Sequence, residues 1–135
     1  MNAMFYLKLY VLTVPVFFVI DMLWLGLIAR GFYREKLAAF LSPTVNWPAA
    51  IIFYLLFIVG IIFFAVMPGR AKDSLFMTAT YGALFGFFTY ATYDLTNLAT
   101  LKSWPLSVVV VDILWGMVLC SIVASISFFI AKWIN

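Results

Sequence analysis

Histidine is absent from this chain, and cysteine occurs once, at Cys120. A lone cysteine cannot form an intrachain disulfide. Zinc and haem sites mostly use histidine and cysteine ligands, and serine–histidine or cysteine–histidine catalytic pairs need a histidine. We therefore expect no metal site, no cofactor and no catalytic residue of these classes.

Charged residues are also scarce. They make up 10% of the 135 residues, whereas 67% are hydrophobic; soluble domains are about one quarter charged. The lysines and arginines lie near the ends of apolar segments, where such side chains reach toward lipid head groups, so the net charge of +3 does not indicate nucleic-acid binding. The composition predicts one integral membrane domain whose first partner is the lipid bilayer.

Four apolar segments are long enough to cross a bilayer, which takes about 20 residues. They cover about residues 5–29, 47–67, 74–98 and 105–133. We therefore predict an all-α, multi-pass membrane protein with a bundle of four transmembrane helices. The basic residues divide evenly between the two sides, so the sequence does not fix the orientation.

The first connection, residues 30–46, is the longest. Its pattern predicts a short interfacial helix with Phe32 and Leu37 toward lipid and Arg34 and Lys36 toward water. An irregular loop is the alternative.

Three aspartates lie within the apolar segments: Asp21, Asp94 and Asp112. A carboxylate at the centre of a transmembrane helix costs about 2.5–3.5 kcal/mol, so such residues face the protein interior or water. Asp21 and Asp94 come late in their segments and Asp112 comes early. Since consecutive spans alternate in direction, all three are displaced toward the same membrane face, by roughly 6, 12 and 9 Å from the helix midpoints. We expect them to share one layer.

Small residues accompany two of these acids. The third segment repeats Thr78, Gly82, Gly86, Tyr90 and Asp94 at four-residue spacing, and the fourth repeats Asp112, Gly116, Cys120 and Ala124. Small residues at this spacing let two helices approach closely. The pattern predicts that these acids face a neighbouring helix, although the glycines themselves are explained by packing alone.

Aromatic and polar residues gather near the acids. Trp24 follows Asp21 by three residues, and Trp115 follows Asp112 by three, so each tryptophan shares a helix face with its acid. Both pairs belong to a D-x-L-W motif, which either marks an inverted repeat or is a chance match. The candidate ligand-binding residues are Asp21, Asp94, Asp112, Asn97, Tyr93, Tyr90, Trp24, Trp115 and Thr96.

Three ionised carboxylates in one dry layer would repel one another, so at least one holds a proton or a cation lies among them. The first interpretation is binding, with transport left open, of a small cationic or amphipathic ligand against acidic and aromatic walls. A homodimer, as in small multidrug exporters, is also left open. In a second interpretation the acids only lock helix packing in a structural or partner-binding bundle. A third is a lipid-modifying enzyme, which no nucleophile or phosphate-binding motif supports.

The segments around Asp21-x-x-Trp24, Tyr93–Asn97 and Asp112-x-x-Trp115-Gly116 resemble a family of short four-span bacterial membrane proteins of unknown function. This resemblance covers nearly the whole chain and implies a multi-pass protein of the bacterial inner membrane. A fainter similarity, through Asn97-Leu98, Trp104-Pro105 and Val111–Trp115, is to the tryptophan-rich sensory proteins. That family binds porphyrins and related apolar ligands, so the similarity implies ligand binding.

Overall fold

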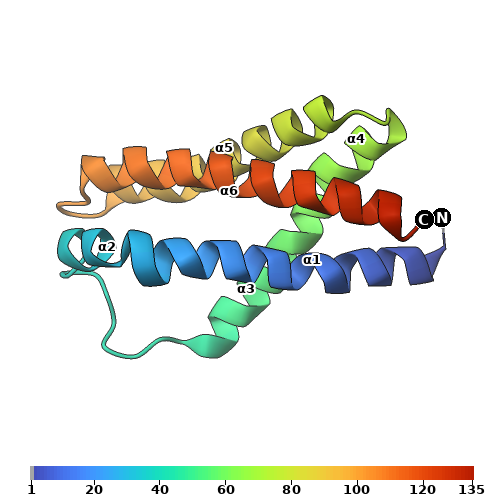
Figure 1. The fold of residues 1–135 in the computed structure, drawn as a ribbon. Coiled ribbons are helices and arrows are strands. Elements are labelled where there is room, and N and C mark those ends of the chain that lie inside the picture. The colour runs from blue at the N-terminus through green and yellow to red at the C-terminus, as the bar shows by residue number, and fades with distance from the viewer. Residues whose placement is uncertain (1) are drawn as a thin grey trace.

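A computed structural model describes residues 2–135, and this part of the chain contains helices and their connections but no strand (Figure 1). The elements in chain order are α1 (Ala3–Leu23), η1 (Trp24–Ile28), α2 (Arg30–Lys36), α3 (Trp47–Ile61), η2 (Ile62–Val66), α4 (Met67–Ala71), α5 (Leu75–Thr100) and α6 (Leu106–Trp133). The two η elements are single π-helical turns that continue α1 and α3. The all-helical prediction is confirmed.

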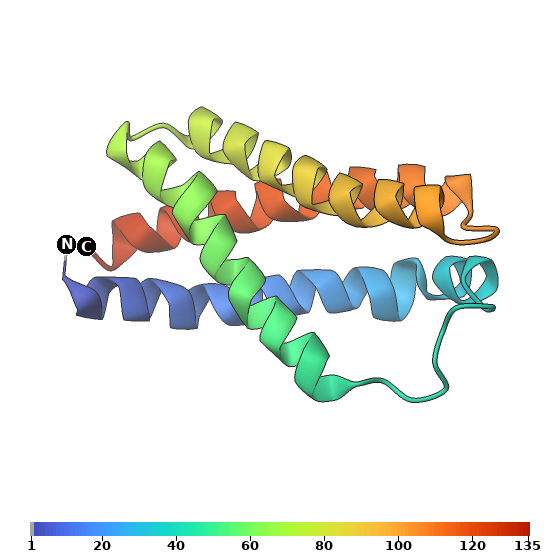
Figure 2. The same cartoon turned by 180° about the vertical axis from the view of Figure 1, so that it is seen from behind.

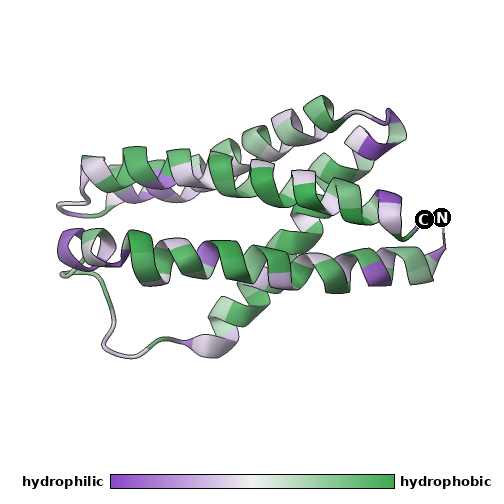
Figure 3. Ribbon diagram, in the orientation of Figure 1, coloured by the Kyte–Doolittle hydropathy of each residue, from purple (hydrophilic) through white to green (hydrophobic). Residues whose placement is uncertain are grey.

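The described residues contain three helical stretches that are long and apolar enough to cross a membrane. They are Ala3–Ile28, Trp47–Ala71 and Leu106–Trp133. The remaining long helix, α5, has 26 residues, or about 39 Å at 1.5 Å per residue, but it is more polar. Figure 3 shows hydrophobic colour along most of α1, α3 and α6 and hydrophilic colour concentrated toward the ends of the bundle.

The helices α1, α5 and α6 run lengthwise side by side, and the α3–α4 rod crosses them obliquely (Figures 1 and 2). The two chain termini lie next to each other at one end, which we call the terminal end. The opposite end, which we call the loop end, carries α2 and the connection between α5 and α6. The late parts of α1 and α5 and the early part of α6 therefore lie together at the loop end.

Helix starts in the chain follow local sequence signals. The side chain of Asn46 accepts the backbone N–H of Ala49 at 3.2 Å, and Ser74 Oγ accepts that of Met77 at 3.1 Å. Each caps an N–H group that has no partner inside its helix. Pro48 occupies the first turn of α3, where its missing N–H costs nothing.

The pair α5 and α6 forms the most extensive helix contact in the bundle. A Cβ atom on Gly82 would lie 2.6 Å from the carbonyl oxygen of Cys120, and one on Gly86 would collide with the backbone of Gly116. The ring of Tyr90 in turn covers Gly116. This confirms the predicted close approach of the two small-residue stripes. The closest contact between the two helices lies on the terminal side of Asp94 and Asp112.

Two apolar clusters divide the interior. The main core fills the middle and the terminal end and includes Leu9, Phe17, Ile58, Ile61, Leu119 and Val123. A smaller cluster at the loop end consists of Leu37, Trp104, Val108 and Val109, with Phe32, Tyr33 and Ile113 packed against it. The predicted short helix is confirmed as α2, but the placement of Phe32 and Leu37 toward lipid is wrong. Both pack on α6 and Trp104, because a protein surface buries them more completely than the interface would.

Candidate functional site

The three aspartates converge on the loop end of the bundle. Asp21 is 3% exposed and Asp94 is 0% exposed, whereas Asp112 is half-buried. We call these three residues the acid layer. Asp94 and Asp112 are adjacent, close enough to share a hydrogen bond when one of them carries a proton, and we call them the acid pair. Asp21 is bonded to Trp115 and lies within the reach of the charge on Asp112.

Hydrogen bonds connect the two D-x-L-W motifs across the bundle. Trp115 on α6 donates its indole N–H to Asp21 on α1, with 3.2 Å between Nε1 and Oδ1. Trp24 on η1, the turn that continues α1, donates to the hydroxyl of Tyr33 at 3.2 Å, and Tyr33 donates to Asp112 on α6 at 2.8 Å. The rings of Trp24 and Trp115 stack on each other, with centroids 4.5 Å apart and planes 10° from parallel. Both tryptophans are candidate ligand-binding residues, and in this structure they stack on each other.

Tyr33 is held in place by the short helix α2. Its ring packs against the loop-end apolar cluster, and its hydroxyl links an indole of α1 to a carboxylate of α6. Burial and the negative charge of Asp112 raise the pKa of Tyr33 well above its ordinary value. Tyr33 therefore stays neutral at physiological pH and acts as a hydrogen-bond donor to Asp112.

Asp94 is the exceptional member of the layer. Both of its carboxylate oxygens are buried, and while both acids of the pair are ionised neither oxygen has a hydrogen-bond partner in the described part of the chain. A proton shared with Asp112 would supply one. The single salt bridge among residues 2–135 joins Lys132 to Asp73 at the terminal end, so no lysine or arginine neutralises the acid layer. Two ionised carboxylates about 4 Å apart repel by about 4 kcal/mol at an effective dielectric constant of about 20. The acid pair is therefore built to hold a positive charge or a proton.

Two further tyrosines border the layer from its inner side. The side chain of Tyr54 on α3 lies within hydrogen-bonding reach of Asp21. Tyr90 on α5 lies over Gly116 and contacts Phe57, with ring centroids 6.2 Å apart. Both tyrosines pack against the main core, so the inner wall of the layer is continuous with the most stable part of the fold.

The remaining predicted residues lie at the rim. Tyr93 is exposed and meets Trp104 edge to face, with centroids 5.9 Å apart, while Asn97 can donate to the Tyr93 hydroxyl. Thr96 is exposed and bonds back to carbonyl groups of its own helix, including that of Tyr93 at 3.1 Å. The structure therefore groups the acids, both tryptophans and Tyr90, and it leaves Thr96 outside the layer.

The candidate residues taken from the sequence include neither Tyr33 nor Tyr54. Tyr33 lies in the long first connection, and Leu37 follows it by four positions, so both occupy one face of a helical turn. That spacing was the available signal. No comparable signal marks Tyr54, whose partner Asp21 is 33 positions away and is reached only because α3 crosses α1.

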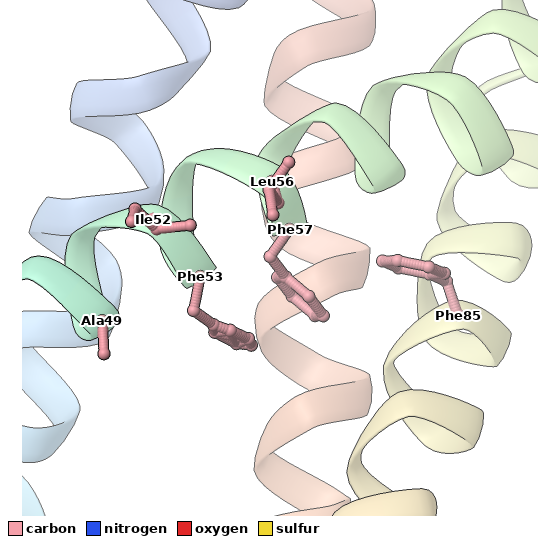
Figure 4. Close-up of a pocket in the computed structure, with 6 residues that line it drawn as sticks. All are labelled: Ala49, Ile52, Phe53, Leu56, Phe57 and Phe85. Carbon is pink, nitrogen blue, oxygen red and sulfur yellow. The ribbon is translucent and has the colours of Figure 1, made fainter.

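An apolar pocket lies away from the acid layer. It is an open, apolar groove of about 600 Å³ lined by Ala49, Ile52, Phe53, Leu56, Phe57 and Phe85 (Figure 4). It contains none of the predicted site residues, and Ile52, Phe53 and Leu56 also face outward. The groove has the character of a lipid-facing surface, since aromatic and aliphatic side chains form all of it.

The geometry of the acid layer limits its chemistry. Within residues 2–135 no group of three His, Cys, Asp or Glu side chains is arranged to hold a metal ion. A paired carboxyl site of this kind can bind and release a proton, or it can bind an organic cation between a carboxylate and aromatic faces. In either case the site holds one positive charge, carried by a proton or by an organic cation.

Comparisons with known proteins identify a family but no function. Neither a curated protein nor a solved structure matches the chain. The similarity to tryptophan-rich sensory proteins is not shown. A family described as "Predicted membrane protein (DUF2177)" matches residues 6–129, which include every member of the acid layer and both D-x-L-W motifs. The chain therefore belongs to this family of predicted membrane proteins of unknown function.

Proposed function

We propose that this membrane protein binds a small cationic or amphipathic ligand at the acid pair of Asp94 and Asp112. The observation that carries the proposal is the state of Asp94, whose two buried carboxylate oxygens have no partner. Leaving a buried polar group unsatisfied costs about 1–3 kcal/mol, and more when it is charged. A ligand cation that fills this position removes that cost, so the missing partner becomes a source of binding energy.

A purely structural role accounts for only part of the layer. Asp21 links α1 to α6 through Trp115, and Asp112 links α6 to α2 through Tyr33. Each of these acids behaves like the polar residues that hold membrane helices together. Among residues 2–135 Asp94 makes no such link: its carboxylate oxygens have no hydrogen-bond partner, and the group beside it is another carboxyl group. A bundle that used its acids only to hold helices together would not need Asp94.

In the proposed mechanism, the empty acid pair shares one proton. The arriving cation takes the place of that proton beside Asp94, and the proton leaves, so the charge of the pair changes little during exchange. Trp24 and Trp115 border the same layer, and the ring faces that they do not stack on each other would favour an organic cation over a small hydrated ion. Coupling of proton release to cation uptake would also allow transport.

We also propose that α5 is a fourth membrane span and that the protein lies in a bacterial inner membrane. The length of α5, its close packing along α6 and the apolar character of its neighbours support the fourth span. Its threonine hydroxyls bond to carbonyl groups one turn back, which reduces the cost of placing them in lipid. Labelling of cysteines introduced in the loops on each side would test the span count.

Titration calorimetry with tetraphenylphosphonium, an aromatic lipophilic cation, tests the binding proposal in lipid nanodiscs. We expect saturable binding by the wild type, with about one proton released per cation in buffers of different ionisation enthalpy. Asp94→Asn should weaken binding by at least tenfold and abolish proton release, since a neutral amide neither attracts the cation nor holds the exchanged proton.

Asp73→Asn is the matched control. It removes an aspartate that is exposed, belongs to the salt bridge with Lys132 and lies at the terminal end, so binding should match the wild type. Equal affinity of Asp94→Asn and wild type, or binding without proton release, would rule out the proposed site.

A further inference from the structure

We infer that α2 is a hinged cover over the acid pair, that Tyr33 is the residue that fastens it, and that the ligand therefore enters from the loop end of the bundle. The inference depends on the proposed function for the identity of the ligand. It adds the route by which the ligand reaches its site and a residue that controls that route.

Access to the acid pair requires motion. Asp94 is fully buried, and the open groove on α3 lies away from the acids. A ligand can reach Asp94 only if some part of the surrounding wall moves.

The inner wall is an unfavourable place for such motion. Toward the terminal end the layer is bordered by Tyr54, Tyr90 and Trp115, and all three pack against the main core. That core holds fully buried side chains from α1, α3 and α6. An opening on this side would disrupt the packing of the whole bundle.

The wall at the loop end is separate from that core. There, Leu37 and its neighbours form the smaller apolar cluster with Trp104, Val108 and Val109. Moving α2 outward breaks this cluster and the hydrogen bonds of Tyr33 but does not disturb the side chains of the main core. Local opening is expected where few buried contacts must be broken.

Both ends of α2 are suited to a hinge. At its start, Ala29 leaves the helical conformation, with φ −109° and ψ 8°, directly after the π-helical turn η1. At its end, residues 41–46 carry no helix and are exposed, up to the start of α3. Hinges are commonly a few loop or element-end residues that absorb changes in backbone angles.

Tyr33 supplies the fastening. Among residues 2–135 it is the one side chain outside the long helices that donates a hydrogen bond to the acid layer. Its hydroxyl also accepts from Trp24, so it ties the cover to both α1 and α6. When α2 moves outward, Asp112 loses its donor and the acid pair faces the opening.

Chemical labelling of Asp94 tests the cover directly. A water-soluble carbodiimide with glycine ethyl ester modifies carboxyl groups that it can reach, and peptide mass spectrometry reads each aspartate separately. Because one hydrogen bond changes an equilibrium by about three- to tenfold, Tyr33→Phe should raise the labelling rate of Asp94 by that factor. Tyr6→Phe removes the hydroxyl of an exposed tyrosine at the terminal end and should leave the rate unchanged.

A reversible crosslink provides a second, independent variant. Leu37→Cys and Val108→Cys, combined with Cys120→Ala, place one thiol on each side of the loop-end cluster. A short bis-methanethiosulfonate reagent should lower the labelling of Asp94 at least tenfold, and reduction should restore it in the same sample. Asp73, exposed at the terminal end, serves as the internal reference.

The outcomes separate the cover from the binding proposal. Equal labelling of Asp94 in the crosslinked and reduced protein would overturn the cover. Labelling that responds to the crosslink but is not slowed by tetraphenylphosphonium would support the cover and refute the proposed ligand class. Labelling controlled by the crosslink and slowed by the cation would support both.

Discussion

Replacement of Asp94 by valine should stabilise the protein. Valine keeps nearly the same size with no polar atoms, so Asp94→Val removes two buried oxygens that lack partners. Removal of an unsatisfied buried group gains about 1–3 kcal/mol, and the poorer helix propensity of valine returns about 0.5 kcal/mol of this. The net gain of about 0.5–2.5 kcal/mol corresponds to a rise of roughly 2–10 °C in melting temperature for a chain of this size.

The chain carries its own unfolding probe for this measurement. Cys120 is the sole cysteine and is fully buried, so a thiol-reactive coumarin becomes fluorescent only as the bundle opens. The matched comparison is Asp21→Val, which leaves the indole N–H of Trp115 without its acceptor and should lower the melting temperature by a similar amount.

The opposite signs of these two changes are the diagnostic result. If both substitutions lower the melting temperature, Asp94 has a structural partner, and the reasoning that assigns it to a ligand fails. If Asp94→Val is more stable but no longer binds tetraphenylphosphonium, stability and binding compete at this position. Residues kept for function often carry such a cost.

Three further predictions follow from the same geometry. Gly86→Ala should lower stability by about 1–3 kcal/mol because its Cβ collides with the α6 backbone, whereas Gly26→Ala, with open space around it, should not; the Cys120 melting assay measures both. Trp115→Phe should keep the stacked ring but cost about 1–2 kcal/mol, since Asp21 then loses its indole donor; restored stability in the double variant with Asp21→Val would identify that bond as the cause. The raised pKa of Tyr33 means that its stabilising effect is complete below about pH 10 and declines by about 1.4 kcal/mol per pH unit above it; the difference between wild type and Tyr33→Phe in tryptophan-monitored unfolding should be flat from pH 6 to 9 and shrink from pH 10 to 11.

The convergence of the acids was predictable because it depends on simple quantities. Span length, helix rise and alternating direction place Asp21, Asp94 and Asp112 at one end of the bundle, and the small-residue stripes orient α5 toward α6. None of these inferences needs side-chain coordinates. The helix that became α2 was predicted from the amphipathic pattern of residues 30–46.

The partners of the acids were not predictable in the same way. Trp115 bonds to Asp21, an acid of another helix, although it shares a face with Asp112 in its own. Sequence spacing describes neighbours within a helix, whereas the pairing across helices depends on rotation about each axis. Tyr33 was missed for a related reason, since a loop residue can meet α6 only after the whole bundle has fixed the position of α2.

The predicted count of four spans shows a limit of hydropathy as a guide to membrane-spanning helices. Residues 74–98 read as a span by their apolar content, yet α5 is the long helix whose polarity keeps it below the other three. Its extra polar residues include Asp94, Asn97 and several threonines. Hydropathy alone does not distinguish polar residues buried inside a membrane span from polar residues exposed to water. For α5, the close packing against α6 supports a membrane span.

The two D-x-L-W motifs make the final argument for where function lies. On antiparallel helices they face each other with stacked indoles, so an arrangement related by local two-fold symmetry would give each aspartate one tryptophan donor. The observed arrangement departs from this symmetry on one side only. Asp112 receives Tyr33 in place of an indole and gains Asp94 as a neighbour, while Asp21 keeps the simple bond. A bundle that needed its acids only to hold helices together could repeat the Asp21 bond twice. We therefore assign the proposed ligand to the side that departs from symmetry, where Tyr33 replaces an indole donor and Asp94 lacks a partner.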